Sequence, residues 1–242
     1  MLRLHYNLEK VSMGLVAGII VAASIGGIVE IAPLFTIHET VELPDDLRPN
    51  TPLEIAGREI YIREGCYACH SQMVRSLADE IDRYGPYSLA SESAYDHPML
   101  WGSKRTGPDI ARLGGKYSDD WHVKHMINPR DVVPASIMPS YPWLTQPLDT
   151  SILKGEIATL AKLGVPYDDA MIENAVADAR AQANPDSDGA DAVQERYGEH
   201  VAVRAFDGNP AELTEMDALV AYLQSLGTLT NAPYKVMQEA EK

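Results

Sequence analysis

The sequence has few cysteines, few positive charges relative to negative ones, and no alternation of apolar and polar residues typical of strands. Its 242 residues include only two cysteines, which excludes a disulfide framework and a four-cysteine zinc site. It has no continuous basic stripe and a formal net charge of −15, which argues against nucleic acid as a partner and favours a positively charged protein. The missing strand pattern, beside several helical periodicities, predicts an all-α fold.

One long apolar run stands near the start of the chain. Residues 11–29 carry no charge, and the apolar stretch resumes after Glu30 as far as residue 35. A helix of this length can span a bilayer core of roughly 30 Å. A cleaved signal peptide is the alternative, but the run exceeds the usual apolar core of roughly 7–15 residues, and no convincing small-residue cleavage signal follows it. We predict an uncleaved transmembrane anchor over residues 11–35.

The charges on the two sides of this run differ in sign. Arg3 and Lys10 precede it, whereas the far side is acidic, with Glu30, Glu39, Glu42, Asp45 and Asp46. The positive-inside rule therefore predicts a cytoplasmic N-terminus over residues 1–10. The rest of the chain would then lie in the periplasm, on the outer face of a bacterial inner membrane.

A cysteine–histidine motif follows a linker predicted over residues 36–50. An N-cap, a first-turn proline and a capping-box glutamate mark a helix start, at Thr51, Pro52 and Glu54. The helical pattern runs to the pentapeptide 66–70, which reads Cys-Tyr-Ala-Cys-His. Two thiols at this spacing can reach the two vinyl groups of a haem, and the adjacent histidine then lies under the iron. We predict one covalent haem c held by Cys66, Cys69 and His70.

Two other kinds of site use paired cysteines. A thioredoxin-like Cys-x-x-Cys needs a βαβ pattern around it, which this sequence lacks. A zinc site needs further cysteines, which are also missing. The predicted location of the motif outside the membrane is where haem attachment takes place, so the haem interpretation is favoured.

A six-coordinate haem needs a second axial ligand, and the chain has nine methionines. Met138 lies in the segment 133–142, where three prolines predict a stiff, extended loop able to hold a thioether against the iron. Met73 is too close to the motif to reach the other face of the haem. Met126 and Met216 fit helix faces as core residues. We therefore predict Met138 as the second ligand.

Three further segments have helical patterns, at residues 119–127, 150–163 and 214–226. His122 and His125 are spaced three apart on the first of them and could bind a metal, but solvated side chains are the favoured interpretation. Residues 168–210 are acidic and rich in alanine. We predict that they form a helix followed by a mobile loop, outside the compact core.

Several longer motifs identify a family that this chain resembles. They are residues 57–66, 69–73, 83–85, 95–98, 100–109, 117–122, 128–130, 138–144 and 221–223. With them, the chain resembles the mono-haem cytochrome c subunit of the cbb3-type cytochrome c oxidases. The resemblance covers the anchor, nearly all of residues 52–167 and the last predicted helix.

The resemblance implies a fold and a ligand pair. The fold is one N-terminal transmembrane helix and a class I-like cytochrome c domain over residues 51–230 with long loop insertions, followed by a C-terminal tail over 231–242. The axial ligands of the family correspond to His70 and Met138. The family commonly has a shorter connection before the last helix, so residues 168–210 resemble an acidic insertion. A surface excursion is favoured for this insertion over a docking surface for a respiratory partner.

The resemblance also implies a function and partners. Electrons would enter this haem from c-type cytochromes, soluble or membrane-bound, or from the cytochrome bc1 complex. They would leave to a catalytic subunit that carries haem b and a haem b3–copper centre and reduces oxygen to water. A di-haem cytochrome c subunit would lie nearby. The loop over residues 101–112 would face the catalytic subunit, where Ser103 would approach a calcium ion; the alternative for Ser103 is an ordinary surface serine.

Two other functions stay open at the level of sequence. The cytochrome c subunit of a nitric oxide reductase also combines a single anchor with a haem c domain. A membrane-tethered thiol oxidoreductase would instead use Cys66 and Cys69 as free thiols.

Overall fold

The computed structural model describes residue 6 and the ranges 10–35 and 43–240. Within these residues every regular element is a helix, and the one isolated β-bridge joins Pro147 to Thr214. The all-α prediction is therefore confirmed. The chain divides into two compact units, residues 1–43 and residues 44–242. The orientation was predicted partly from Arg3, Glu39 and Glu42, which lie outside the described residues. Residues 36–42 of the predicted linker lie outside them too.

The first unit contains one long helix, α2 (Ser12–Ile31), followed by a short 3-10 turn over Ala32–Phe35. No residue of α2 is buried. The stretch from Ser12 to Leu34 has a mean hydropathy of 2.3 and is long enough to cross a membrane. These properties are consistent with the predicted single-pass anchor.

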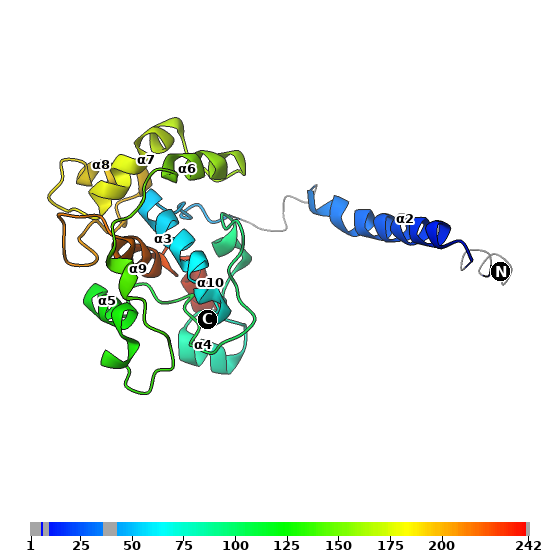
Figure 1. The fold of residues 1–242 in the computed structure, drawn as a ribbon, viewed down its shortest axis with the longest axis horizontal. Helices are drawn as coiled ribbons and strands as arrows, with labels where there is room; N and C mark the ends of the chain where they lie inside the picture. The colour runs from blue at the N-terminus through cyan, green and yellow to red at the C-terminus, as the bar shows by residue number, and fades with distance from the viewer. Residues whose placement is uncertain (1–5, 7–9, 36–42, 241–242) are drawn as a thin grey trace. The chain divides into compact units, whose positions relative to one another are not determined.

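The second unit packs its helices around one crossing pair. Its helices are α3 (Pro52–Arg63), α4 (Ala78–Tyr84), α5 (Asp119–Ile127), α6 (Leu153–Lys162), α7 (Asp169–Gln182), α8 (Ala190–Tyr197), α9 (Glu215–Ser225) and α10 (Ala232–Ala240). Helices α3 and α9 cross at its centre, α6, α7 and α8 gather at one end, and α4 and α10 lie at the other (Figure 1).

Helix α3 begins at the capping box predicted from the sequence. The Thr51 hydroxyl accepts a hydrogen bond from Glu54 N (3.2 Å), and the Glu54 carboxylate accepts one from Thr51 N (2.9 Å). Pro52 occupies the first turn, where a backbone N–H would have no partner in the helix. Arg48 also pairs with Glu54 at 2.8 Å. The start of α3 is thus fixed before its packing is considered.

The crossing of α3 and α9 depends on a glycine. A Cβ at Gly57 would overlap the backbone carbonyl of Ala218, so the two helices are in backbone contact there. One turn further along, the rings of Tyr61 and Tyr222 meet edge to face with centroids 5.6 Å apart. Helix α9 begins with its own capping box, formed by Thr214 and Asp217. The crossing forms the centre of the main hydrophobic core.

The acidic stretch 168–210 differs from its prediction. It contains two helices, α7 and α8, where a helix and a mobile loop were predicted. Both contribute to the core, with Ala175, Ala179 and Val193 fully buried. Many of its charges lie on the surface, and its small alanines allow α7 to approach α3 closely. The stretch is therefore part of the packed unit.

A buried polar contact also joins α7 to the start of α3. The Thr51 hydroxyl donates to the Gln182 side-chain oxygen (2.5 Å), and both residues are almost completely buried. The Tyr167 hydroxyl donates to the carbonyl of Asn50 at 2.7 Å. The first residues of α3 are thereby held by two side chains that lie 131 and 117 residues further along the chain.

Two helices besides α8 were not predicted, α4 and α10. Helix α10 lies in the predicted C-terminal tail, and the chain just before it is held by Asp46. That carboxylate accepts hydrogen bonds from the Thr230 hydroxyl (2.7 Å) and from Asn231 N (3.1 Å). These hydrogen bonds lower the pKa of Asp46 to about 2. The beginning and the end of the second unit are thus joined.

Replacing the glycine at the helix crossing tests this description. In Gly57→Ala the new methyl group has no space between α3 and Ala218, so we expect a loss of about 1–3 kcal/mol in the free energy of unfolding. Chemical denaturation of the purified protein, followed by helical circular dichroism, measures it. Gly155→Ala in α6 is the matched control, because its Cβ meets open space. Equal stability of the two variants would contradict the backbone contact.

Candidate haem site

The attachment motif forms a tight turn directly after α3. Gly65 has a φ of 72°, a left-handed conformation that glycine adopts without strain, and it reverses the chain at the end of the helix. The carbonyl of Cys66 then accepts hydrogen bonds from Cys69 N (3.1 Å) and His70 N (2.9 Å). Cys66 is half-buried and Cys69 is exposed, and they form no disulfide with each other. The turn therefore places Cys66 on the core side and Cys69 on the surface side of the motif.

The ring of His70 is oriented by a backbone carbonyl. Its Nδ1 lies 2.9 Å from the oxygen of Pro108. Because a carbonyl oxygen only accepts, Nδ1 carries the proton and Nε2 keeps its lone pair. This is the arrangement that a metal-binding histidine needs, since the second nitrogen fixes both tautomer and ring direction. The orientation of His70 thus fits the role of a ligand to a haem iron.

A glycine makes room for this ring. A Cβ at Gly107 would overlap the imidazole of His70, so the backbone of residues 107 and 108 packs flat against it. The amide of Gly107 also donates to the carbonyl of Cys69 at 2.9 Å. The loop is therefore hydrogen-bonded to the motif at two points, the carbonyl of Cys69 and the ring of His70.

A buried ionic cluster holds this loop in register with the motif. Arg105 donates to the Ser71 hydroxyl (2.5 Å) and to the Met73 carbonyl (2.8 Å), and it pairs with Asp109 and Glu80. Asp109 in turn accepts from the Ser71 hydroxyl (2.6 Å) and from Met73 N (2.9 Å). Hydrogen bonds from Arg105 and from a second arginine lower the pKa of Glu80 to about 2. Glu80 is thus charged at neutral pH, and the cluster fixes the position of Pro108 through Arg105 and Asp109.

The Met138 loop lies against the same part of the core. Met138 is half-buried, and it packs with Cys66 and Tyr141 against the main hydrophobic cluster. Tyr141 N donates to the carbonyl of Met126 in α5 (2.7 Å), and the indole of Trp143 donates to Glu64 at the end of α3 (3.3 Å). The loop is therefore fastened at one end to α5 and to the end of α3, directly before the motif. That Met138 and His70 ligate one iron stays a prediction.

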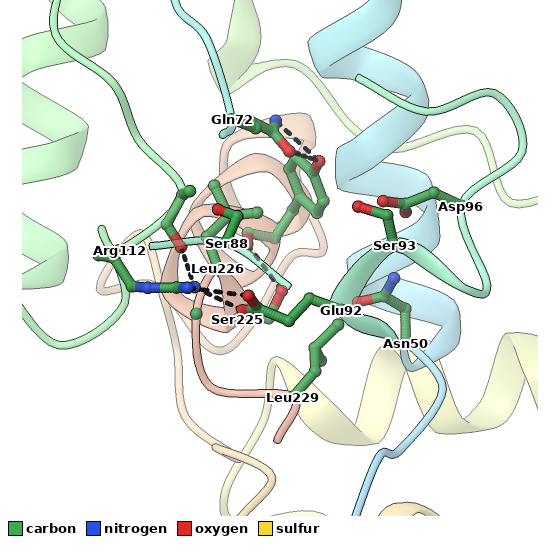
Figure 2. A pocket seen from close by; sticks show the side chains of 13 residues that line it. Asn50, Gln72, Ser88, Glu92, Ser93, Asp96, Arg112, Ser225, Leu226 and Leu229 are labelled. Carbon is green, nitrogen blue, oxygen red and sulfur yellow. Dashed lines mark hydrogen bonds and ion pairs between the residues drawn. The ribbon is translucent and has the colours of Figure 1, made fainter. Parts of the chain in front are cut away.

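Behind the motif lies a polar pocket (Figure 2). Gln72 and the hydroxyl of Tyr222 exchange hydrogen bonds of 3.0 and 3.1 Å on one side of it, and Arg112 pairs with Glu92 on another. Neither cysteine of the motif, His70 nor Met138 lines this pocket. It is separate from the candidate haem site and contributes to it only through the position of Gln72.

Ser103 is exposed in the loop that follows Trp101. Within the described residues, no group of three or more histidine, cysteine or acidic side chains is placed to hold a metal ion. The calcium contact of Ser103 therefore stays a prediction.

The prediction that His122 and His125 are solvated is wrong for His122. His122 is 1% exposed, because the face of α5 that carries it packs toward α9. Burial lowers its pKa to about 4, so its ring is neutral at pH 7. His125 is only partly exposed and stacks on Trp121, with ring centroids 4.6 Å apart. Trp121 stacks in turn on Tyr117 at 4.1 Å.

Comparison with known proteins agrees with this geometry. A family model described as "Cytochrome C oxidase, mono-heme subunit/FixO" matches residues 5–230. The chain belongs to this family. A comparison with curated proteins gives no match. Membership of the FixO family confirms the resemblance to the mono-haem subunit of cbb3-type oxidases, and it implies one haem and a place in a cytochrome c oxidase complex.

Sequence reasoning missed the residues that position His70. Gly107, Pro108 and Asp109 lie in residues 100–109, one of the segments that carry the family resemblance. No contact with His70 was predicted for them. A glycine followed by a proline predicts a loop, and nothing local shows that this loop packs on a histidine ring.

Adding one methyl group beside His70 tests the fit. In Gly107→Ala the Cβ overlaps the imidazole, so the ring must turn away from the carbonyl of Pro108. We expect a lower haem content per polypeptide and an altered visible spectrum of the haem that remains. Haem and protein are quantified on the purified subunit, with Gly155→Ala as the control. An unchanged spectrum at full haem content would show that the ring is not confined as described.

Proposed function

We propose that Cys66 and Cys69 bind one haem c covalently and that His70 and Met138 are its axial ligands. The observation that carries this proposal is the hydrogen bond from His70 Nδ1 to Pro108, which leaves Nε2 available for iron. A haem with histidine and methionine ligands supplies one-electron chemistry at a raised potential. The chain contributes the attachment sites, the ligands and their orientation.

On this basis the chain is the electron-relay subunit of a cbb3-type terminal oxidase. It receives electrons from c-type cytochromes or the cytochrome bc1 complex and passes them to the catalytic subunit with haem b and the haem b3–copper centre. That subunit reduces oxygen to water, and a di-haem cytochrome c subunit completes the assembly. Membership of the FixO family and the site geometry support this role.

Helix α2 anchors the subunit in the bacterial inner membrane, with the second unit on the periplasmic side. Its length and composition support the anchor, and Lys10 before it supports the orientation. The loop over residues 101–112 turns toward the catalytic subunit. Trp101 in this loop is 39% exposed and offers an apolar contact there.

A thiol oxidoreductase is disfavoured by the state of Cys66. Burial, and after it the nearby Glu64 carboxylate, raise the pKa of this thiol to about 12. A redox-active dithiol requires the opposite shift, because the thiolate is the nucleophile. A nitric oxide reductase subunit fits the same anchor and haem site, so the metal content of the complex must separate the two.

The inventory of metals and haems in the detergent-purified complex tests the function. The cbb3-type assembly predicts haem c, haem b and copper in one complex that turns over oxygen. A complex that lacks copper and turns over nitric oxide would favour the reductase. Two alkylatable thiols in a chain without haem absorbance would contradict both and favour the oxidoreductase.

Substituting the predicted sixth ligand tests Met138. In Met138→His the haem remains attached, but the stronger nitrogen donor stabilises the ferric form, so the midpoint potential falls. A redox titration followed by visible spectroscopy measures it. Met99→His is the control, because Met99 is 53% exposed in another loop. A parental spectrum and potential in Met138→His would exclude Met138 as a ligand.

A further inference from the structure

The loop that contains Pro108 is bonded to the backbone of the motif segment on both sides of this proline. Before it, the amide of Gly107 donates to the carbonyl of Cys69 at 2.9 Å. After it, the amide of Ile110 donates to the carbonyl of Ser71, also at 2.9 Å. A proline has no N–H to give, so Pro108 offers only its carbonyl, which faces the ring of the predicted axial histidine. The bond to that ring therefore lies between two backbone bonds.

The side chain of Asp109 connects the same two segments. It is completely buried, with 0% of its side chain exposed. One carboxylate oxygen accepts from the Ser71 hydroxyl (2.6 Å) and from Met73 N (2.9 Å), both in the motif segment. The other accepts from Ala111 N (2.9 Å), in the loop of Asp109 itself. The carboxylate is therefore a bridge between the loop and the motif segment.

The surroundings of Asp109 require a carboxylate. Besides these three donors, the guanidinium of Arg105 donates to it at 3.2 Å. An ionised carboxylate only accepts, whereas the amide of asparagine has one acceptor oxygen and one NH₂ donor. An asparagine at this position would therefore place its NH₂ group against at least one of the four donors. The bridge would lose part of its hydrogen bonding although its shape is kept.

We propose that Asp109 is a positioning residue of the haem site, which sets the hydrogen bond from His70 Nδ1 to the carbonyl of Pro108. The inference rests on the proposed ligation of iron by His70. Asp109 directly follows Pro108 and is bonded to Ser71, which directly follows His70, so its carboxylate fixes the carbonyl against the ring. A fixed acceptor at Nδ1 makes Nε2 a stronger donor to iron. The stronger donor favours ferric iron, and Asp109 thereby lowers the potential of the haem.

The test uses Asp109→Asn in the full-length, haem-loaded subunit. We expect the Nδ1 proton of His70 in the reduced protein to exchange with deuterium about tenfold faster, as the loss of one hydrogen bond would give. Nuclear magnetic resonance measures this exchange. We also expect a reduction equilibrium about fivefold more favourable, a rise of about 40 mV at about 59 mV per tenfold. A redox titration measures it.

Two further variants complete the comparison. Ser71→Ala removes one hydrogen bond of the bridge and should change both quantities in the same direction by a smaller amount. Asp178→Asn is the matched control, because Asp178 is also a buried carboxylate paired with an arginine. It lies in α7, which is bonded to the start of α3 rather than to the motif. Asp178→Asn should match the parent in exchange and in potential.

The outcomes separate this inference from the proposed function. Parental exchange and potential in Asp109→Asn would overturn the role of Asp109 and leave the ligation by His70 intact. A raised potential with parental exchange would also overturn it, because the lost charge alone would then be the cause. Equal changes in Asp178→Asn would overturn it as a general loosening of the fold.

Two further results are decisive. If Asp109→Asn takes up no haem, parental values in Ser71→Ala overturn the inference. If the ring protons of His70 in the reduced parent protein show no ring-current shift from a haem, both the ligation by His70 and the inference are wrong.

Discussion

The backbone contact between α3 and α9 is the constraint on which the rest of this protein depends. Gly57 lets the two helices approach until a carbonyl of α9 takes the place of a side chain on α3. That approach brings Tyr222 within hydrogen-bonding distance of Gln72, two residues beyond the motif. It also brings Tyr61, on the helix that ends at the motif, against the ring of Tyr222. The position of the haem motif is therefore set by a helix that lies near the other end of the chain.

From this centre the candidate site is held by three separate segments. Helix α3 carries the motif, the loop with Gly107 and Pro108 orients the histidine, and the proline-rich loop carries Met138. Each is fastened by contacts of its own: a helix crossing, a buried ionic cluster, and hydrogen bonds to α5 and Glu64. A site for electron transfer benefits from such support, because ligands held by surrounding packing keep their geometry when the charge of the iron changes.

The sequence predicted what is determined locally. The capping box of Thr51 and Glu54 places the start of α3, and periodicity gives the bounds of α5. The Cys-x-x-Cys-His motif predicts the attachment residues that are proposed above. The burial of His122 was missed because a spacing of three places two residues on one face without showing which face packs inward. Helix α8 was missed because it is short and charged. An ion pair joins Arg196 of this helix to the buried Asp178 of α7. This tertiary contact cannot be read from the local sequence.

The contacts of Asp46 also have a mechanical consequence. This carboxylate lies near the point where the chain enters the second unit, and it joins that entry to residues just before the last helix. A force on the chain where it enters the second unit would therefore act first on the hydrogen bonds of Asp46 to Thr230 and Asn231. The ion pair of Arg48 with Glu54 would resist it next. Asp46 thus ties the entry of the second unit to its last segment, so that neither end can move away without breaking hydrogen bonds to a charged group.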